Sequence, residues 1–175
     1  MAVKCLLVLY SYHHRNTEKI ARVFARVLDA QIRRPQTIEP EELQAYDLIG
    51  FGSGIYHDMH HRSLLDLADK LPHGTEGKAF IFSTSGAPAF ALEGGQLEDY
   101  IGRVHSPLRE KLRSKGYVIV DEFVCPGWNT NKFLKLFGGI NKGRPNAEDL
   151  ERAEAFARGL RQHASDSADG QGHQA

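Results

Sequence analysis

Polar residues that could bind an anion follow the first apolar run of the sequence. The run VKCLLVLY (3–10) leads into SYHHRNT (11–17), and a segment with helical periodicity begins near Asn16. A turn that enters a helix offers free backbone N–H groups and the positive end of the helix dipole, and both favour an anion. The hydroxyl, amide, imidazole and guanidinium groups of the turn suit a phosphate with nearly two negative charges. The turn could equally be a capped helix start with a solvated basic tip.

Three further turns of similar composition follow later apolar runs. They read SGIYHDMHH (53–61), STSGAPAF (83–90) and CPGWNTN (125–131). Gly54 and Gly86 would let a ligand approach the backbone closely, and Tyr56 and Trp128 could supply planes on which an aromatic ring stacks. Other roles stay open, because Tyr56 could be a half-buried anchor and Trp128 a packing plug beneath the last turn.

Strand and helix patterns alternate along the chain, and this alternation predicts where the four turns lie. Strands are predicted in 3–10, 30–38, 47–56, 78–86 and 117–127, and helices in 16–30, 39–46, 61–72, 106–116 and 145–162. Such alternation implies an α/β fold with a doubly wound parallel sheet of five strands. Because ligands bind at the carboxyl ends of strands in these sheets, the four turns should meet at one edge. We expect the strand in 47–56 to end in a turn at Ser53 and Gly54, and Asn146 to cap the last helix.

The composition fits one globular domain and argues against several classes of function. The chain has 175 residues, of which 41% are hydrophobic and 25% charged. Lys plus Arg and Asp plus Glu number 22 each, which argues against a nucleic-acid-binding protein. Two cysteines, Cys5 and Cys125, favour a reducing cytoplasm, and no segment has the length of a membrane span. We expect one domain over residues 1–162 and a disordered tail over residues 163–175.

The same turns carry a resemblance to the flavodoxin-like family. The segments concerned are LVLYSYHHRNTEKIA (7–21), YDLIGFGSGIY (46–56), KAFIFSTSG (78–86) and GGINKGRPNAEDLERAEAFA (138–157). The first resembles the phosphate-binding loop of flavodoxins, in which an apolar strand leads into a loop that ends in Asn-Thr-Glu. The resemblance covers residues 3–162. It implies a flavodoxin-like sandwich with strand order 2-1-3-4-5 and FMN as the cofactor.

The resemblance also implies which residues bind FMN. Around the phosphate it places Ser11, Tyr12, His13, His14, Arg15, Asn16 and Thr17. Beside the flavin ring it places Ser53, Gly54, Ile55, Tyr56 and His57, and at the other ring edge Ser83, Thr84, Ser85 and Gly86. We add Trp128 as a candidate plane for the ring. Flavodoxins commonly have Gly where this chain has Arg15. Arginine would be strained there if the position needs positive φ, and otherwise it could pair with the phosphate.

The resemblance leaves the activity open between several redox functions. A flavodoxin-like protein transfers electrons between proteins, or from NAD(P)H to a small acceptor such as a quinone. The pattern also resembles menaquinone-dependent protoporphyrinogen oxidase and quinone reductases. Flavodoxins are usually acidic, whereas this chain is neutral, which leaves room for a reductase of small molecules. A non-catalytic module that binds another phosphorylated ligand is the alternative. No side chain is placed well enough by the sequence to name a catalytic acid or base.

Two features remain outside this assignment. His13, His14, His57, His60 and His61 could gather near one site, but the spacing of the known zinc motifs is missing, so we expect no metal. The connection over residues 86–105 is long for such a fold. It could be a lid, part of a substrate pocket, a homodimer contact or an inert insertion.

Overall fold

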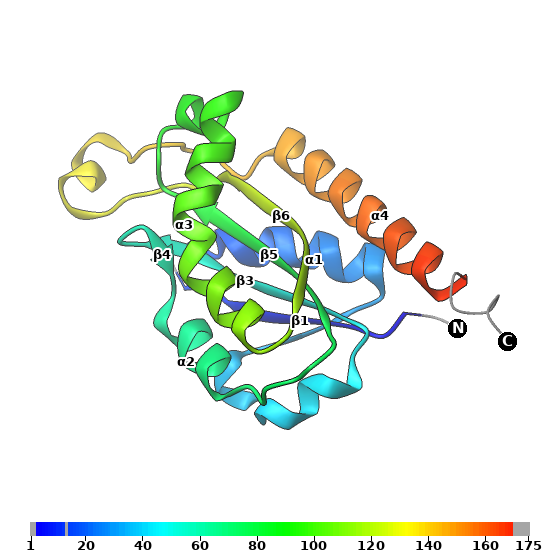
Figure 1. The fold of residues 1–175 in the computed structure, drawn as a ribbon. Coiled ribbons are helices and arrows are strands. Elements are labelled where there is room, and N and C mark those ends of the chain that lie inside the picture. The colour runs from blue at the N-terminus through cyan, green and yellow to red at the C-terminus, as the bar shows by residue number, and fades with distance from the viewer. Residues whose placement is uncertain (1–2, 13, 170–175) are drawn as a thin grey trace, which may run out of the picture.

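Five parallel strands form the centre of the molecule (Figure 1). The computed structural model describes residues 3–12 and 14–169, without the side chains of residues 132, 133 and 163–169. The parallel strands are β1 (Cys5–Tyr10), β2 (Gln31–Arg33), β3 (Leu48–Tyr56), β5 (Lys78–Ser85) and β6 (Val118–Pro126). They lie in the order β2-β1-β3-β5-β6, which is 2-1-3-4-5 among the parallel strands and confirms the predicted fold.

Helices cover both faces of the sheet, so that each face has its own core (Figure 1). The helices are α1 (Asn16–Leu28) and α4 (Ala147–Asp169) on one face, and α2 (Arg62–Lys70) and α3 (Gly95–Ser114) on the other. Alternate residues of a strand point to opposite faces. Phe80 and Phe82 of β5 therefore belong to the core under α1 and α4, whereas Ala79 and Ile81 belong to the core under α2 and α3.

Two glycines of β3 make room for phenylalanine rings of β5. Gly50 is paired with Phe80, and Gly52 with Phe82. A Cβ atom on Gly50 or Gly52 would lie 2.4 Å or 2.1 Å from the ring of its partner, closer than packed atoms allow. Both rings pack edge-on against Phe24 of α1, with centroids 5.7 Å and 5.1 Å away. This packing fixes α1, which begins at the predicted phosphate turn, against the sheet.

Short 3₁₀ helices occupy several connections. They are η1 (Pro35–Thr37), η2 (Pro40–Ala45), η3 (Ala89–Leu92) and η4 (Lys132–Phe137). The helix predicted in 39–46 is therefore a 3₁₀ helix. Asn146 caps α4 as predicted, because its side-chain Oδ1 accepts from the N–H of Asp149 at 3.1 Å. The buried Asp149 carboxylate accepts from the N–H of Asn146 in return and binds the guanidinium of Arg144.

The predicted end of β3 at Ser53 and Gly54 is wrong. The strand continues to Tyr56, turns at His57 and Asp58, and pairs antiparallel with the two-residue strand β4 (Met59–His60). His57 and Asp58 have φ values of 50° and 60°, the left-handed conformation that a tight hairpin turn needs. Neither residue is a glycine, so the usual sequence signal of such a turn is missing.

The long connection predicted over residues 86–105 is also largely helical. Helix α3 begins at Gly95, well before residue 106, and Pro107 lies inside it. A proline inside a helix removes one backbone hydrogen bond but is tolerated in the first turn, so the sequence pattern predicts a helix that begins at residue 106. At the other end of the chain, α4 extends through Asp169, past the domain boundary expected at residue 162.

Candidate functional site

An open cleft lies at the carboxyl edge of the sheet, where the turns after β1, β3, β5 and β6 meet. About 520 Å³ of space free of protein atoms lies within it, part of it open to solvent. Predicted residues that line it are Ser11, Tyr12, His14, Asn16, Thr17, Gly54, Ile55, Tyr56, Thr84, Ser85, Gly86 and Trp128. The structure thus brings together parts of all four turns, as the strand-end argument predicts.

The remaining predicted residues are placed differently. Arg15, Ser53, His57 and Ser83 do not line the cleft, and His13 lies outside the described residues. The cleft has four lining residues that sequence reasoning missed: Gly127, Asn129, Thr130 and Asn131. They flank Trp128 in the turn CPGWNTN, with Gly127 before it and the other three after it, and the Asn-Thr-Asn run has the same amide and hydroxyl composition as the first turn. That composition is the signal that could have found them.

The turn between β1 and α1 exposes the start of the helix to the cleft. Arg15 stands at the N-cap position with φ 50° and ψ 34°, and its side chain makes no capping hydrogen bond. The N–H of Glu18 donates to Ser11 Oγ at 3.3 Å. The guanidinium of Arg15 lies 3.8 Å from Glu18, and the Arg15 side chain is three-quarters exposed. The position therefore needs the positive φ that glycine adopts freely, and arginine pays for it in backbone strain.

Asn16 is the buried polar residue at the bottom of this turn. Its Nδ2 donates to the carbonyl oxygen of Trp128 at 2.9 Å. That carbonyl can only accept, so the orientation of the amide is fixed. Asn16 Oδ1 is buried and has no hydrogen-bond partner among the described residues. A buried acceptor without a donor is costly, and a ligand hydroxyl in the cleft would supply the missing hydrogen bond.

A pair of threonines joins the first turn to the turn after β5. Thr17 Oγ1 and Thr84 Oγ1 lie 2.8 Å apart, and both residues are buried. Ser85, the next residue, accepts the N–H of Ala87 at its Oγ and contacts the hydroxyl of Tyr100 from α3. These contacts fix the hydroxyl groups along the floor of the cleft.

Trp128 stands at the side of the cleft with one face already covered. The ring of His14 stacks on it with centroids 4.1 Å apart and an interplanar angle of 25°. His14 Nε2 also lies 2.8 Å from Thr130 Oγ1, and Trp128 Nε1 donates to the carbonyl of Gly138 at 3.1 Å. Trp128 therefore lines the cleft and is also held by its own turn, and its contact with a ligand ring stays a prediction.

Tyr56 lies across Gly54 at the boundary with a second hollow. A Cβ atom on Gly54 would lie 3.2 Å from the Tyr56 hydroxyl, so a side chain there would crowd the ring. The second hollow shares Tyr12 and Tyr56 with the cleft and is lined further by Tyr10, His57, Met59, His60, His61 and Arg62. Tyr10 and His61 stack in parallel there, with centroids 3.5 Å apart. The half-buried Tyr56 is next to aromatic surface that suits a planar ligand.

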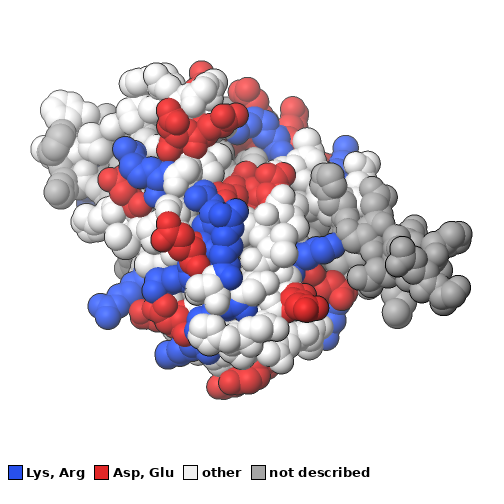
Figure 2. Space-filling model, viewed as in Figure 1, with Lys and Arg blue, Asp and Glu red and all other residues white. Residues whose placement is uncertain are grey.

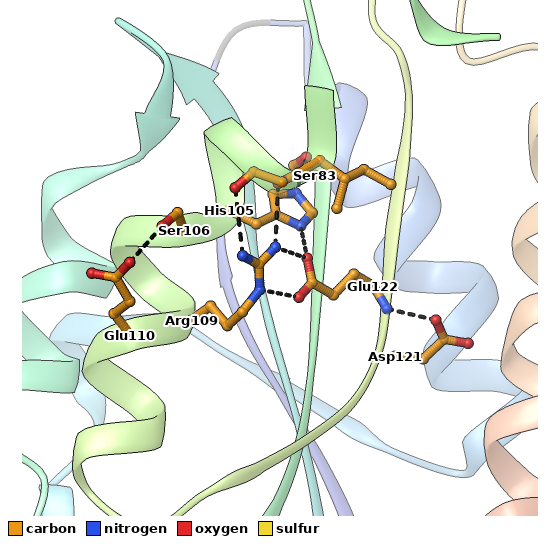
Figure 3. A network of polar contacts seen from close by, with 9 residues as sticks. Ser83, His105, Ser106, Arg109, Glu110, Asp121 and Glu122 are labelled. Carbon is orange, nitrogen blue, oxygen red and sulfur yellow. Dashed lines mark hydrogen bonds and ion pairs between the residues drawn. The ribbon is translucent and has the colours of Figure 1, made fainter. Parts of the chain in front are cut away.

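Ser53 and Ser83 do not line the cleft, and Ser83 belongs to a buried polar network (Figure 3). Ser83 Oγ lies 2.8 Å from His105 Nε2, and His105 Nδ1 lies 2.9 Å from Glu122 Oε2. Arg109 binds both carboxylate oxygens of Glu122. Ser83 and His105 are fully buried, so no substrate can reach this serine although Ser, His and Glu stand in the order of a hydrolase triad.

A second histidine lies against this network from β4. Ser53 Oγ donates to the carbonyl of Gly54 and accepts from the N–H of His61. His60 Nδ1, 3.0 Å away, must therefore donate to Ser53 Oγ, which leaves His60 Nε2 without a partner among the described residues. The rings of His60 and His105 are 4.9 Å apart. These contacts tie the β3–β4 hairpin to α3.

Burial determines the protonation of these groups. It lowers the pKa of His60 well below the usual range, and the neighbouring His105 lowers it further. Burial also lowers the pKa of His105, although the hydrogen bond to Glu122 opposes this shift. Burial alone would raise the pKa of Glu122, but the hydrogen bonds from Arg109 and His105 outweigh it and bring the pKa to about 2. The network thus consists of an ionised Glu–Arg pair and two neutral histidines at pH 7.

The cysteines and the possible metal ligands do not add chemistry to the cleft. Burial raises the pKa of Cys125 and raises that of Cys5 to about 12, so both thiols stay protonated. Within the part of the chain that the structure describes, no three His, Cys, Asp or Glu residues are grouped as a metal site requires. None of the described helices is long and apolar enough to cross a membrane.

Comparison with known proteins gives one relative at high identity and several structures with the same fold. The sequence is 44% identical over 158 residues to "Uncharacterized protein MJ0298" of Methanocaldococcus jannaschii, which covers 90% of this chain and 98% of that protein. No family model matches. Oxidised flavodoxin 2 from Bacillus cereus superposes with a TM-score of 0.61 at 21% identity, over 89% of this chain and 95% of that one. A flavodoxin from the domain Archaea gives 0.57 at 16% identity, over 93% and 99%.

Proposed function

From the premise that this chain belongs to the same family as MJ0298 and has the flavodoxin-like fold, we propose that it binds FMN and acts as a redox protein. The observation that carries the proposal is the cleft at the start of α1. It combines an anion-binding helix terminus, hydroxyl donors and the unpartnered Asn16 Oδ1. A ligand that fits must offer a negative group and a hydroxyl donor together. The phosphate and ribityl hydroxyls of FMN provide both.

Each part of the cleft has a role in this proposal. Ser11, Thr17 and the first backbone N–H groups of α1 would hold the phosphate, and Asn16 Oδ1 would accept from a ribityl hydroxyl. Tyr56 and Trp128 would border the ring. The neutral hydroxyls and the backbone carry the binding here, because Arg15 is turned toward Glu18. When bound, FMN supplies the electron-transfer chemistry, and the protein positions it and excludes water.

The electron partners belong to the same proposal. Tyr12, Tyr56 and the hollow beside them offer apolar and aromatic surface, which supports a small planar acceptor such as a quinone with NAD(P)H as donor. Transfer to a partner protein is the other form of the proposal. The buried free thiols of Cys5 and Cys125 support a reducing compartment, the cytoplasm.

An FMN titration of the purified protein tests the proposal. We expect flavin absorption bands, either as purified or after FMN is added, and binding of FMN at least about 100-fold tighter than riboflavin, because two or more charge-assisted hydrogen bonds to the phosphate are lost in riboflavin. Equal affinity for the two flavins, or none, would contradict it. If inorganic phosphate protects the protein from unfolding but no flavin binds, the cleft serves another phosphorylated ligand. Quinone-dependent NAD(P)H consumption by the isolated protein distinguishes a reductase from a carrier.

A further inference from the structure

The segment between β6 and α4 carries the most exposed apolar side chains of the described chain. Leu136 and Phe137 are adjacent in η4, and 83% and 82% of their surface is exposed. Figure 1 shows this segment, in yellow, projecting away from the sheet at its carboxyl edge. Single exposed apolar residues are common, but two neighbouring large ones at a projecting tip indicate a contact surface. Phe90 of η3 adds a further exposed ring, 74% exposed.

The projection is a built feature of the fold. Asn129 and Ile140 exchange two backbone hydrogen bonds, of 3.0 Å and 2.9 Å, that close its base. The Asn141 amide donates to the carbonyl of Ala87 at 2.7 Å and accepts from the N–H of Ala89, which links the base to η3 next to Phe90. The tip is therefore held outward by a fixed base, with its apolar side chains presented to solvent.

The charge of this segment differs from that of the whole chain. Between Glu122 and Glu148 the sequence contains no Asp or Glu, but it has lysines at 132, 135 and 142 and an arginine at 144. Arg144 is paired with Asp149, whereas Lys135 and Lys142 are exposed. Elsewhere basic and acidic residues are interspersed, as the face in Figure 2 shows. An apolar tip flanked by lysines, with no carboxylate in the segment, is complementary to an interface of acyl chains below anionic headgroups.

We propose that residues 131–143 form a contact element for anionic membrane surfaces, with Leu136 and Phe137 entering the interface and Lys135 and Lys142 facing the lipid phosphates. The contact is reversible, because two apolar side chains and a few lysines are a weak anchor. The projection begins at Asn131, a residue of the cleft wall. Binding would therefore hold the cleft near the lipid, where a lipid-soluble acceptor is dissolved. Only this last consequence rests on the proposed redox function.

Cosedimentation of the full chain with lipid vesicles tests the proposal. We expect binding to vesicles of equal parts phosphatidylglycerol and phosphatidylcholine, little binding to phosphatidylcholine alone, and weaker binding as salt rises. The double variant Leu136→Ser/Phe137→Ser should lower the partition coefficient by at least about tenfold. Lys135→Gln and Lys142→Gln should each lower it by about fivefold. The matched controls are Val118→Ser, on the exposed first residue of β6, and Lys70→Gln, on the exposed last residue of α2, and both should bind as the unmodified protein does.

Several results would overturn the proposal. They are absence of binding to the anionic vesicles at low salt, binding that does not depend on the anionic lipid, and equal losses in the tip and control variants. A dimer in light scattering that the Leu136→Ser/Phe137→Ser variant dissociates, without vesicle binding, would assign the tip to a second copy of the chain instead. FMN titration of the same samples keeps the two proposals apart, because loss of flavin binding with intact vesicle binding contradicts the redox proposal alone.

Discussion

Serine and histidine side chains occur near the ends of adjacent strands in two settings with opposite properties. In the turn after β1, Ser11 and His14 line the open cleft. Inside β3 and β5, Ser53 and Ser83 are fully buried and bonded to His60 and His105. The same residue types thus provide donors that face the cleft in one place and a buried polar network in the other. The direction of the side chain and the partners already present, rather than the residue type, decide which role is available.

The largest expected effect comes from breaking the buried polar network at Glu122. In Glu122→Ala, Arg109 and His105 lose the carboxylate that they share, and a half-buried guanidinium is left without its partner. We expect the free energy of unfolding to fall by about 3 kcal/mol, measured by urea denaturation. Glu110→Ala is the control, because this exposed carboxylate bonds only Ser106 Oγ in the network of Figure 3, and its loss should change stability by less than about 0.5 kcal/mol. Equal losses of stability in the two variants would mean that the buried network contributes nothing to the free energy of unfolding.

The next effect is the pH dependence that two neutral buried histidines produce. The folded-state pKa values of His60 and His105 are lowered, so below pH about 6.5 the unfolded chain binds protons that the folded protein does not. The free energy of unfolding is therefore not reduced by these histidines above that pH. It falls as the pH drops, by about 1 kcal/mol per pH unit or more between pH 6 and 5. Urea unfolding at several pH values measures the slope. His60→Gln should reduce it, and a slope unchanged in that variant would contradict the assignment.

A matched pair of serine substitutions separates the two settings directly. Ser11→Ala removes a hydroxyl from the cleft and should weaken FMN binding by about tenfold, with a stability loss of only about 0.5 kcal/mol from the long hydrogen bond that Ser11 Oγ accepts from the Glu18 N–H. Ser83→Ala leaves His105 Nε2 without its donor and should cost about 1–3 kcal/mol of stability while FMN affinity stays within about twofold. Flavin fluorescence and urea denaturation provide the two readouts. The comparison fails if each variant alters both quantities in parallel.

The smallest effect concerns the strained cap of α1. Arg15→Gly relieves the positive φ, and we expect a gain of up to about 1 kcal/mol, with FMN affinity changed by less than about threefold because the side chain does not line the cleft. Arg15→Ala keeps the strain and removes the charge, so it should show no gain. A large loss of FMN affinity in both variants would show that the guanidinium binds the phosphate after all.

The sequence predicts the sheet because buried parallel strands read as continuous apolar runs. The same pattern predicts the start of α1 near Asn16 and the meeting of the four turns at one edge. The strand order is predicted by the resemblance to flavodoxins. The sequence pattern fails where local signals conflict with long-range packing. Because Pro107 is typical of a helix start, the sequence does not predict the part of α3 before residue 106. The hairpin turn at His57 and Asp58 has no glycine, so the sequence does not predict it either.

The site residues show the same limit. Hydroxyl and amide composition located the turns, but it could not tell which side chains face the cleft. Ser53 and Ser83 are paired in register on neighbouring strands. Both hydroxyl groups are buried because they bond to the buried rings of His60 and His105. Periodicity cannot pair either histidine with its serine. His60 lies in a two-residue strand that the sequence does not predict, and His105 lies at the end of the segment predicted to be a connection. From the turn CPGWNTN the sequence predicts only Trp128 as a site residue, whereas the structure adds Asn129, Thr130 and Asn131 to the lining of the cleft.

A crystal structure of the protein with FMN tests the central claim most directly. We predict the phosphate at the first turn of α1, in contact with Ser11 and Thr17, and a ribityl hydroxyl within hydrogen-bond distance of Asn16 Oδ1. A cleft that stays empty under saturating FMN, or a flavin bound elsewhere with the Asn16 oxygen still unpartnered, would contradict the account.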